Sequence, residues 1–431
     1  MYTADCLTFS SVTVFWRHTV AAVPKRLDEW RTLPSQAQLY LGCISRVKRK
    51  DRLNAVPNAA RSERRAPHIL WICDRSLEKG GVACALYDMY RALLSTSSNI
   101  VFAAPTNAAF PKLEALGATV YKILPTYPQA RGYLWSLASF FAFLKLAVRL
   151  KPDIVVADHT NGLWLLLLLK IIHFPTRAIY RNHGVEFLTD RPLLARLVLR
   201  GVDQIVTVSQ AEADSLRRLT NLPVSLVPNC LPAHCLSPAP FQRMREDPGG
   251  PKIAHIGWLN KAKGIYAFID LMTKLRKEIP GAQGIAIGQI QLERGSKDSR
   301  DDLLALMRAA GILYLGEIPR ERIFQEVDFL LVCSRRESFC LTALEAPFFE
   351  VIPIAYDSPG TRFLLGSFTA CLVENGNIEQ MKNKVLQLWR DPGRRSDICE
   401  HLRMEFRRHF DPAMLATTLT TLFSKFPCGA K

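Results

Sequence analysis

Residues 329–346 read FLLVCSRRESFCLTALEA. Four apolar residues open this stretch and are typical of a buried parallel strand, the two arginines and the polar residues after them predict a turn, and good helix formers close it. A strand that leads through a turn into a helix leaves backbone N–H groups free at the sheet's carboxyl edge, where α/β folds bind anions and sugars. Glu337 and Glu345 flank this turn. Their carboxylates either accept hydrogen bonds from hydroxyls of one ligand or are solvated charges favoured near a helix start.

The chain before this stretch alternates between strand-like and helical patterns from residue 68 onward. Such alternation indicates an α/β fold with a parallel sheet covered by helices on both faces. The expected strands of this first half are 68–73, 100–104, 119–124, 154–157, 178–181 and 204–208, and it closes with 225–230.

A proline-rich polar linker, residues 231–251, separates this half from a second alternation. We therefore predict two Rossmann-like, doubly wound domains that face each other across a cleft, at residues 66–235 and 236–410. Residues 411–431 are expected to form a final helix, with Asp411 as its N-cap and Pro412 at its first position. The strands expected in the second half are 253–256, 284–287, 313–315, 328–332, 352–355 and 369–373, and its helices are 265–279, 377–389 and 396–410.

Composition indicates a globular protein with an anionic partner. Hydrophobic residues make up 48% of the 431, and the formal net charge is +17. Part of this charge lies in residues 1–65, where twelve lysines and arginines stand against five acidic residues. We predict a basic, poorly ordered extension there, with a short helix around 36–47 and a basic cluster at 46–52. A solvated tail is favoured over a targeting or nucleic-acid role, so no nucleic acid is expected as a partner.

Eleven scattered cysteines form no CxxC pair. They indicate reduced thiols in a cytoplasmic protein and no zinc site. No secretory signal is predicted. The apolar stretches 134–150 and 162–172 are too short or too interrupted by charge to span a membrane, and they predict buried helices or a helix lying on a membrane face.

A second turn of interest is IGWLNKAKG at residues 256–264. Gly257 permits close approach of the backbone, and Lys263 can place a charge on a phosphate near the start of the following helix. Alone this is a weak signal, because Lys261 and Lys263 are equally explained as solvated side chains.

Together these stretches resemble the motifs of the retaining family-4 glycosyltransferases (glycosyl transferases group 1) of GT-B fold. Residues 257–264 resemble the family's GRL-x-x-x-KG turn, 337–345 its E-x7-E motif, and 357–361 its SD-x-GG pattern. In the first half, Gly80-Gly81, His183-Gly184 and residues 227–229 stand at the family's usual places. The resemblance covers roughly residues 67–427 and includes a closing helix that crosses back to the first domain.

The resemblance implies a nucleoside-diphosphate sugar as donor and a glycan or lipid-linked hydroxyl as acceptor. Glu345 would bind the ribose, Glu337 the sugar, and Lys263 the departing diphosphate, while His183 would lie near the reacting sugar. The remaining donor-binding residues are expected to be Phe339, Cys340 and Leu341 through their amides, with Gly257, Lys261, Gly80 and Gly81. Such enzymes generally need no metal, because basic side chains and helix N-termini supply the positive field. Retention is ascribed to front-face attack with the leaving phosphate assisting deprotonation, so no protein base is assigned.

Three positions depart from the family pattern. Trp258 replaces the motif arginine, Cys340 replaces a glycine, and Glu350 replaces another glycine after one extra position. Cys230 also stands where a glycine is common. Because of these departures, an alternative function stays open, in which the protein is catalytically impaired and binds a nucleotide or a partner.

Two further alternatives are a sugar-nucleotide epimerase and nucleic-acid binding through the extension. The transferase role most directly suits glycan or surface-polysaccharide assembly, in the cytoplasm or at the inner face of the membrane, with peripheral contact to anionic lipid. His159, His173 and His255 each adjoin an apolar run and are more simply explained as core or loop histidines.

Overall fold

The computed structural model describes residues 66–73, 80–96, 98–105, 110–124, 132–184, 186–190, 192–236, 249–292 and 299–426. The helix expected at 36–47 and the basic cluster at 46–52 lie outside these residues.

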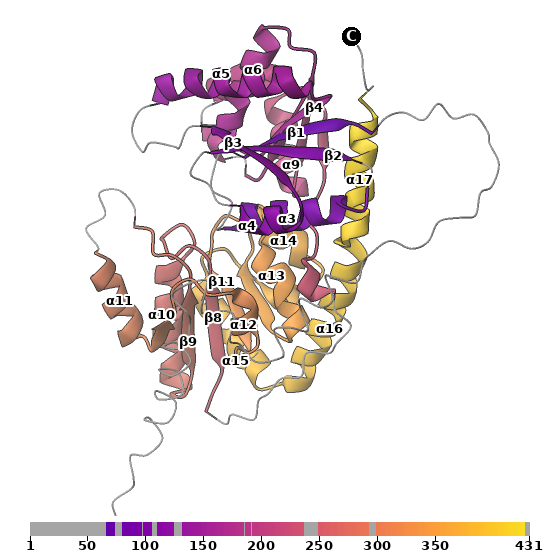
Figure 1. Ribbon diagram of the computed structural model, residues 1–431. Coiled ribbons are helices and arrows are strands. Elements are labelled where there is room, and N and C mark those ends of the chain that lie inside the picture. The colour runs from indigo at the N-terminus through magenta and orange to yellow at the C-terminus, as the bar shows by residue number, and fades with distance from the viewer. Residues whose placement is uncertain are drawn as a thin grey trace, which may run out of the picture. The chain divides into compact units, whose positions relative to one another are not determined.

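The first half forms a parallel sheet in the order β3-β2-β1-β4-β5-β6-β7 (Figure 1). Strand β4 is apolar and buried at all four positions, as expected when both faces of a parallel sheet are covered. The strands are β1 His68–Ile72, β2 Asn99–Pro105, β3 Thr119–Leu124, β4 Ile154–Ala157, β5 Arg177–Asn182, β6 Gln204–Thr207 and β7 Val224–Leu226.

Helices cover both faces of this sheet, because alternate strand residues point to opposite sides. Ile69 and Trp71 of β1 belong to one core cluster, with residues of α3 and α4, and Leu70 and Ile72 to another, with residues of α5, α6 and α8. The helices are α3 Gly81–Leu93, α4 Pro111–Ala115, α5 Gly132–Leu150, α6 Thr160–Ile171, α7 Glu186–Asp190, α8 Pro192–Val198 and α9 Gln210–Leu219.

The second half repeats this architecture, with the parallel strand order β10-β9-β8-β11-β12-β13. Its strands are β8 Lys252–Ile256, β9 Gln283–Ile287, β10 Ile312–Tyr314, β11 Phe329–Val332, β12 Ile352–Tyr356 and β13 Leu372–Val373. Its helices are α10 Ile265–Glu278, α11 Arg300–Ala309, α12 Arg320–Phe324, α13 Leu341–Glu345, α14 Pro359–Leu365, α15 Ile378–Trp389 and α16 Pro392–His409. The predicted α/β architecture of two doubly wound sheets is confirmed.

In each sheet the strand order reverses at a single place, between β1 and β4 in the first sheet and between β8 and β11 in the second. The loops that leave these central strands separate at such a point and open a crevice at the carboxyl edge. The Gly80-Gly81 turn follows β1, the Lys263 turn follows β8, and the Glu337 turn follows β11. The strand order thus explains why the Lys263 and Glu337 turns, which are distant in sequence, lie next to each other at the carboxyl edge of the second sheet, and why the Gly80-Gly81 turn lies at the crevice of the first.

The last helix, α17 (Pro412–Ser424), returns to the first half (Figure 1). The Asp411 side chain accepts a hydrogen bond from the Ala413 amide, and Pro412 occupies the first turn, as the sequence predicts. Leu419, Leu422 and Phe423 are buried in the core cluster that contains α3 and β1. The crossing helix therefore packs against α3 and the core around β1 of the first half.

Two local expectations change. The strand expected at 369–373 begins as a 3-10 helix, Thr369–Cys371, and only Leu372 and Val373 pair with β12, at the sheet's edge. The start of the expected linker is packed: Leu231 and Cys235 are buried among apolar side chains of the second half, and the Leu231 amide donates to the Phe410 carbonyl at 2.8 Å.

The stretches considered as membrane spans are α5 and α6. Within the described residues, no helix is long and apolar enough to cross a membrane.

The burial of α17 can be tested with Phe423→Ala, which removes a fully buried ring. We expect the free energy of unfolding to fall by about 3 kcal/mol, the usual cost of the lost burial and the residual cavity. Met414→Ala on the exposed face of the same helix is the matched control and should change stability by less than about 0.5 kcal/mol. Equal effects of the two in chemical denaturation would contradict the packing of α17.

Candidate functional site

A cleft of about 870 Å³ lies where the carboxyl edges of the two sheets meet, and both halves line it. Most of the predicted site residues are brought together there: Gly80, Gly81, His183, Gly257, Lys263, Glu337, Phe339, Cys340 and Leu341. Two are placed differently. Lys261 is exposed and does not line the cleft, and Glu345 is buried behind its wall.

The turn after β8 has backbone conformations that suit glycine. Gly257 has φ 144° and Gly264 has φ 82°. A side chain on Gly264 would start only 2.2 Å from the Cys333 carbonyl oxygen, so glycine is needed for the turn to pack against the end of β11. The Asn260 side chain accepts from the Lys263 amide at 2.8 Å. These constraints fix the direction from which Lys263 enters the cleft.

Lys263 and Glu337, both predicted as catalytic, form an ion pair. Lys263 Nζ donates to both Glu337 carboxylate oxygens, at 2.8 and 3.0 Å. The pair is partly open to solvent. Both groups therefore remain accessible to a ligand that offers hydroxyls to the carboxylate and an anion to the ammonium.

Glu345 is fully buried. Arg320 Nε donates to its Oε2 at 2.6 Å, and His234 Nε2 lies 3.3 Å from the same oxygen. The other oxygen, Oε1, has no hydrogen-bond partner among the described residues. The sequence prediction thus locates the carboxylate next to the cleft but misses the arginine that holds it.

Asp88 is a second buried carboxyl near Glu345, and the sequence analysis also missed it. Burial, and then the charge of Glu345, raises the pKa of Asp88 to about 7. It lies in the middle of α3, without a motif around it. Its one available signal is its place on the buried face of an amphipathic helix, among Leu86, Met89 and Tyr90.

His183 lies on a buried polar network below the cleft. Arg181 NH1 is 3.1 Å from His183 Nε2, and Arg181 NH2 donates to Asn229 Oδ1 at 2.8 Å. Nε2 also lies 3.4 Å from Asp158 Oδ1, so this nitrogen accepts from the guanidinium in one tautomer and donates to the carboxylate in the other. Asp158 lies 3.6 Å from Arg181 and accepts from Trp71 Nε1 at 2.8 Å.

Burial, followed by the charge of Arg181, lowers the pKa of His183 to about 4. The imidazole is therefore neutral at pH 7, and its Nε2 is engaged by the Arg181 and Asp158 side chains. His183 can offer a hydrogen bond within the cleft, but it is poorly suited to remove a proton.

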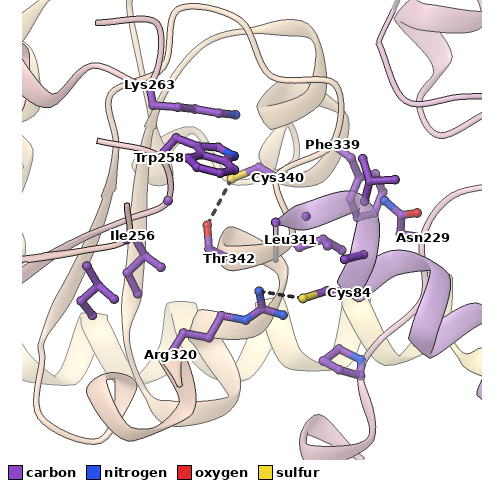
Figure 2. A pocket seen from close by; sticks show the side chains of 18 of the residues that line it. Cys84, Asn229, Ile256, Trp258, Lys263, Arg320, Phe339, Cys340, Leu341 and Thr342 are labelled. Atoms are coloured by element: carbon purple, nitrogen blue, oxygen red, sulfur yellow. Dashed lines mark hydrogen bonds between the residues drawn. The ribbon is translucent and has the colours of Figure 1, made fainter. Parts of the chain in front are cut away.

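Loops of the two halves meet at glycines. Gly80 has φ 96°, starts α3, and its missing Cβ would lie 3.9 Å from Trp258 Nε1. A Cβ on Gly184 would lie 3.1 Å from Ser338 Oγ. Figure 2 shows Trp258 beside Lys263 and Cys340, with Arg320 at the other end of the group and directed towards Cys84.

Two departures from the family pattern stay in the left-handed conformation that glycine favours. Cys340 has φ 74° and precedes α13, and Glu350 has φ 58° after the 3-10 helix Ala346–Phe349. The Phe339 ring is buried against Phe410 at 5.4 Å, so only its backbone can face a ligand. Cys340 and Glu350 thus keep a backbone conformation that glycine adopts more easily, at the expense of local strain.

Of the three histidines interpreted as structural, His159 directly precedes α6 and its ring centroid lies 6.4 Å from that of His183. His255 is buried and stacks on Phe268 at 5.3 Å, and burial lowers its pKa to about 4. His173 is exposed after α6. Among the described residues, no group of three or more His, Cys, Asp or Glu could hold a metal ion.

Two facing doubly wound sheets, with carboxylates and cations at their shared edge, define a protein of the GT-B class. Residues 239–403 match the family "Glycosyl transferases group 1", and residues 79–233 match "Glycosyltransferase Family 4". Together the two matches span most of the chain. The chain belongs to this glycosyltransferase family.

Solved structures share the fold at low sequence identity. Sucrose-phosphate synthase from Thermosynechococcus elongatus has a TM-score of 0.71 at 15% identity, covering 84% of this chain and 99% of that one. HepE of Anabaena, in complex with UDP and glucose, has a TM-score of 0.70 at 18% identity, and the match covers 83% of this chain and 99% of HepE. The lipopolysaccharide outer core galactosyltransferase WaaB, in its apo form, has a TM-score of 0.61 at 14% identity, and the match covers 83% of this chain and 99% of WaaB. No curated protein matches the chain.

The strain at Glu350 can be measured by comparing two substitutions. Both Glu350→Gly and Glu350→Ala remove the carboxylate, which lies 3.6 Å from Arg403. Only alanine keeps a Cβ in the left-handed conformation, so we expect the glycine variant to be more stable by about 1 kcal/mol. Chemical denaturation measures the difference, and an alanine variant as stable as the glycine variant would refute the strain.

The neutral state of His183 predicts a pH dependence of stability. Below about pH 6.5 the unfolded histidine binds a proton that the folded one accepts only near pH 4, so stability falls as the pH is lowered through this window. The decrease attributable to His183 should be about 3 kcal/mol. His183→Asn should remove it in denaturation experiments at pH 7 and pH 4, whereas His409→Asn at an exposed site should not. A wild-type pH dependence in the His183 variant would disprove the assignment.

Proposed function

We propose that this glycosyltransferase transfers a sugar from a nucleoside-diphosphate sugar to an acceptor hydroxyl with retention of anomeric configuration. The observation that carries the proposal is the Lys263–Glu337 pair in the cleft between the sheets. A carboxylate that can bind sugar hydroxyls stands 2.8 Å from an ammonium that can bind a phosphate. The complex of HepE with UDP and glucose supports a donor of this class.

In the proposed reaction, Glu337 orients the donor sugar, and Lys263 stabilises the negative charge that develops on the departing diphosphate. A cation positioned in a partly desolvated cleft acts most strongly on charge that forms in the transition state. The neutral, occupied imidazole of His183 supports a mechanism in which the leaving phosphate assists deprotonation of the acceptor. We propose that His183 donates a hydrogen bond to the sugar, and that no metal takes part.

Surface-polysaccharide or glycan assembly in the cytoplasm is the role we propose, with a lipid-linked acceptor and peripheral contact to anionic membrane. Exposed apolar side chains on α5, α6 and α8 alternate with basic ones, a pattern that suits a lipid surface. These apolar residues are Phe141, Val148, Ile171, Ile172, Leu193 and Leu197, and the exposed basic neighbours include Lys145, Arg149, Arg196 and Arg200.

A catalytically impaired binding module is the second candidate function. The contact between Arg320 and Glu345 supports it, because the carboxylate expected to bind ribose is already paired and buried. Nucleoside-diphosphate binding without turnover on any acceptor would favour this alternative.

The proposal can be tested by incubating purified protein with a panel of nucleotide sugars and measuring release of nucleoside diphosphate, with and without EDTA. We expect release from one donor, unchanged by EDTA. Glu337→Gln and Lys263→Ala should each lower the rate by about 10²-fold or more. Lys277→Ala, at an exposed position of α10 outside the cleft, is the control and should keep the wild-type rate. The transferase proposal fails if no donor is turned over, and the site assignment fails if the two cleft variants behave like the control.

A further inference from the structure

Each glutamate of the pair holds a different cation. Glu337 is bound by Lys263 at 2.8 Å, and Glu345 is bound by Arg320 at 2.6 Å. Lys263 and Arg320 both line the cleft. The site therefore contains two carboxylate–cation pairs, and the sequence motifs contain both members of only the first.

The resemblance to the family leaves one diphosphate cation unaccounted for, because the motif arginine is Trp258. The described lysines and arginines that line the cleft are Lys112, Lys263, Arg320 and Arg336. Arg336 is exposed, where solvent screens its charge, and Lys112 lies over the Tyr87 ring at 5.8 Å. Arg320 is the partly buried arginine among them, and a charge with little solvent around it acts more strongly on an anion.

We propose that Arg320 is the second cation of the donor site and that it reaches the donor by exchange. When a nucleotide enters, ribose hydroxyls replace the guanidinium at Glu345, and the released guanidinium binds a phosphate oxygen. Lys263 and Glu337 undergo the same exchange with phosphate and sugar. This inference rests on the proposed use of a nucleoside-diphosphate sugar.

Unsatisfied hydrogen-bonding groups on both partners favour the exchange. Glu345 Oε1 is buried without a hydrogen-bond partner among the described residues, a state that costs free energy and that a hydroxyl would relieve. Arg320 uses Nε for Glu345, its NH1 contacts the Cys84 thiol at 3.7 Å, and its NH2 has no partner in the described part of the chain. A thiol is a weak acceptor, so the outer edge of the guanidinium remains suited to a bidentate phosphate contact.

The exchange makes the diphosphate essential for tight binding. Uridine offers hydroxyls to Glu345 but gives Arg320 no new partner, so displacing the arginine is not compensated. UDP supplies both. Arg320 should therefore contribute to the ratio of UDP affinity to uridine affinity, and not to recognition of the nucleoside.

Calorimetric titration of the full chain with UDP and with uridine tests this. In Arg320→Gln the ratio of UDP to uridine affinity should fall by about 10- to 100-fold, the usual effect of losing a hydrogen bond to a charged group. Arg320→Lys keeps the charge and should lie within about threefold of the wild type. Introducing Trp258→Arg into the Arg320→Gln chain restores a cation at the motif position and should recover most of the ratio.

A second measurement follows Arg320 in the wild-type chain and uses only the conservative lysine variant, for assignment. The ¹⁵Nε resonance of Arg320 in the wild-type chain, assigned by its loss in Arg320→Lys, should move when UDP is added because the hydrogen bond to Glu345 is broken. Binding of UDP that leaves this resonance unmoved, or an unchanged affinity ratio in Arg320→Gln, would overturn the exchange while leaving the transferase proposal intact. Failure of the wild type to bind UDP or the diphosphates of adenosine, guanosine and thymidine would overturn both.

Discussion

The cleft depends on the cost of burying carboxylates. Glu345 is fully removed from solvent, and a buried carboxylate is tolerated only with a compensating partner. Arg320 provides that partner from α12, and His234 approaches from the segment that joins the two halves. Asp88 on α3 adds a second carboxyl, whose raised pKa reflects the same lack of solvent. Residues from both sheets are therefore linked through one set of charges.

This arrangement connects stability with function. The groups that pair with each other at the cleft are hydrogen-bond partners of the kind that a nucleotide sugar needs: carboxylates for hydroxyls and cations for phosphates. Ligand and protein compete for the same contacts, so binding can replace one set of pairs by another without leaving charges unpaired. The glycines at the meeting of the loops allow this close approach, and Trp258 contributes an uncharged surface where the family usually has a cation.

Much of the fold could be predicted because the local signals agree with each other. Apolar runs of strand length, separated by helical segments, led to two parallel sheets, and Asp411-Pro412 marked the start of the crossing helix. The predicted strand at 369–373 was wrong in part, because the first three residues of this run at the sheet's edge form a 3-10 helix. The predicted linker was also wrong at Leu231 and Cys235, since proline content signals a linker but says nothing about which apolar residues find a neighbouring core.

By itself the sequence determined which residues follow the strands, and so it placed Lys263 and Glu337 at the carboxyl edge of the second sheet and His183 at that of the first. Local order along the chain is enough for this, because parallel strands present their carboxyl ends together. Only the tertiary structure decided how those residues are paired. The contact of Arg320 with Glu345 joins residues 25 positions apart, and the approach of Asp88 and Cys84 joins the two halves. No periodicity or motif predicts such contacts, because the first joins α12 to α13 within the second half and the second depends on the packing of α3 against the core of that half. As a result, Glu337 and Glu345 differ: Glu337 lies in the cleft and is partly exposed, whereas Glu345 is buried and paired with Arg320.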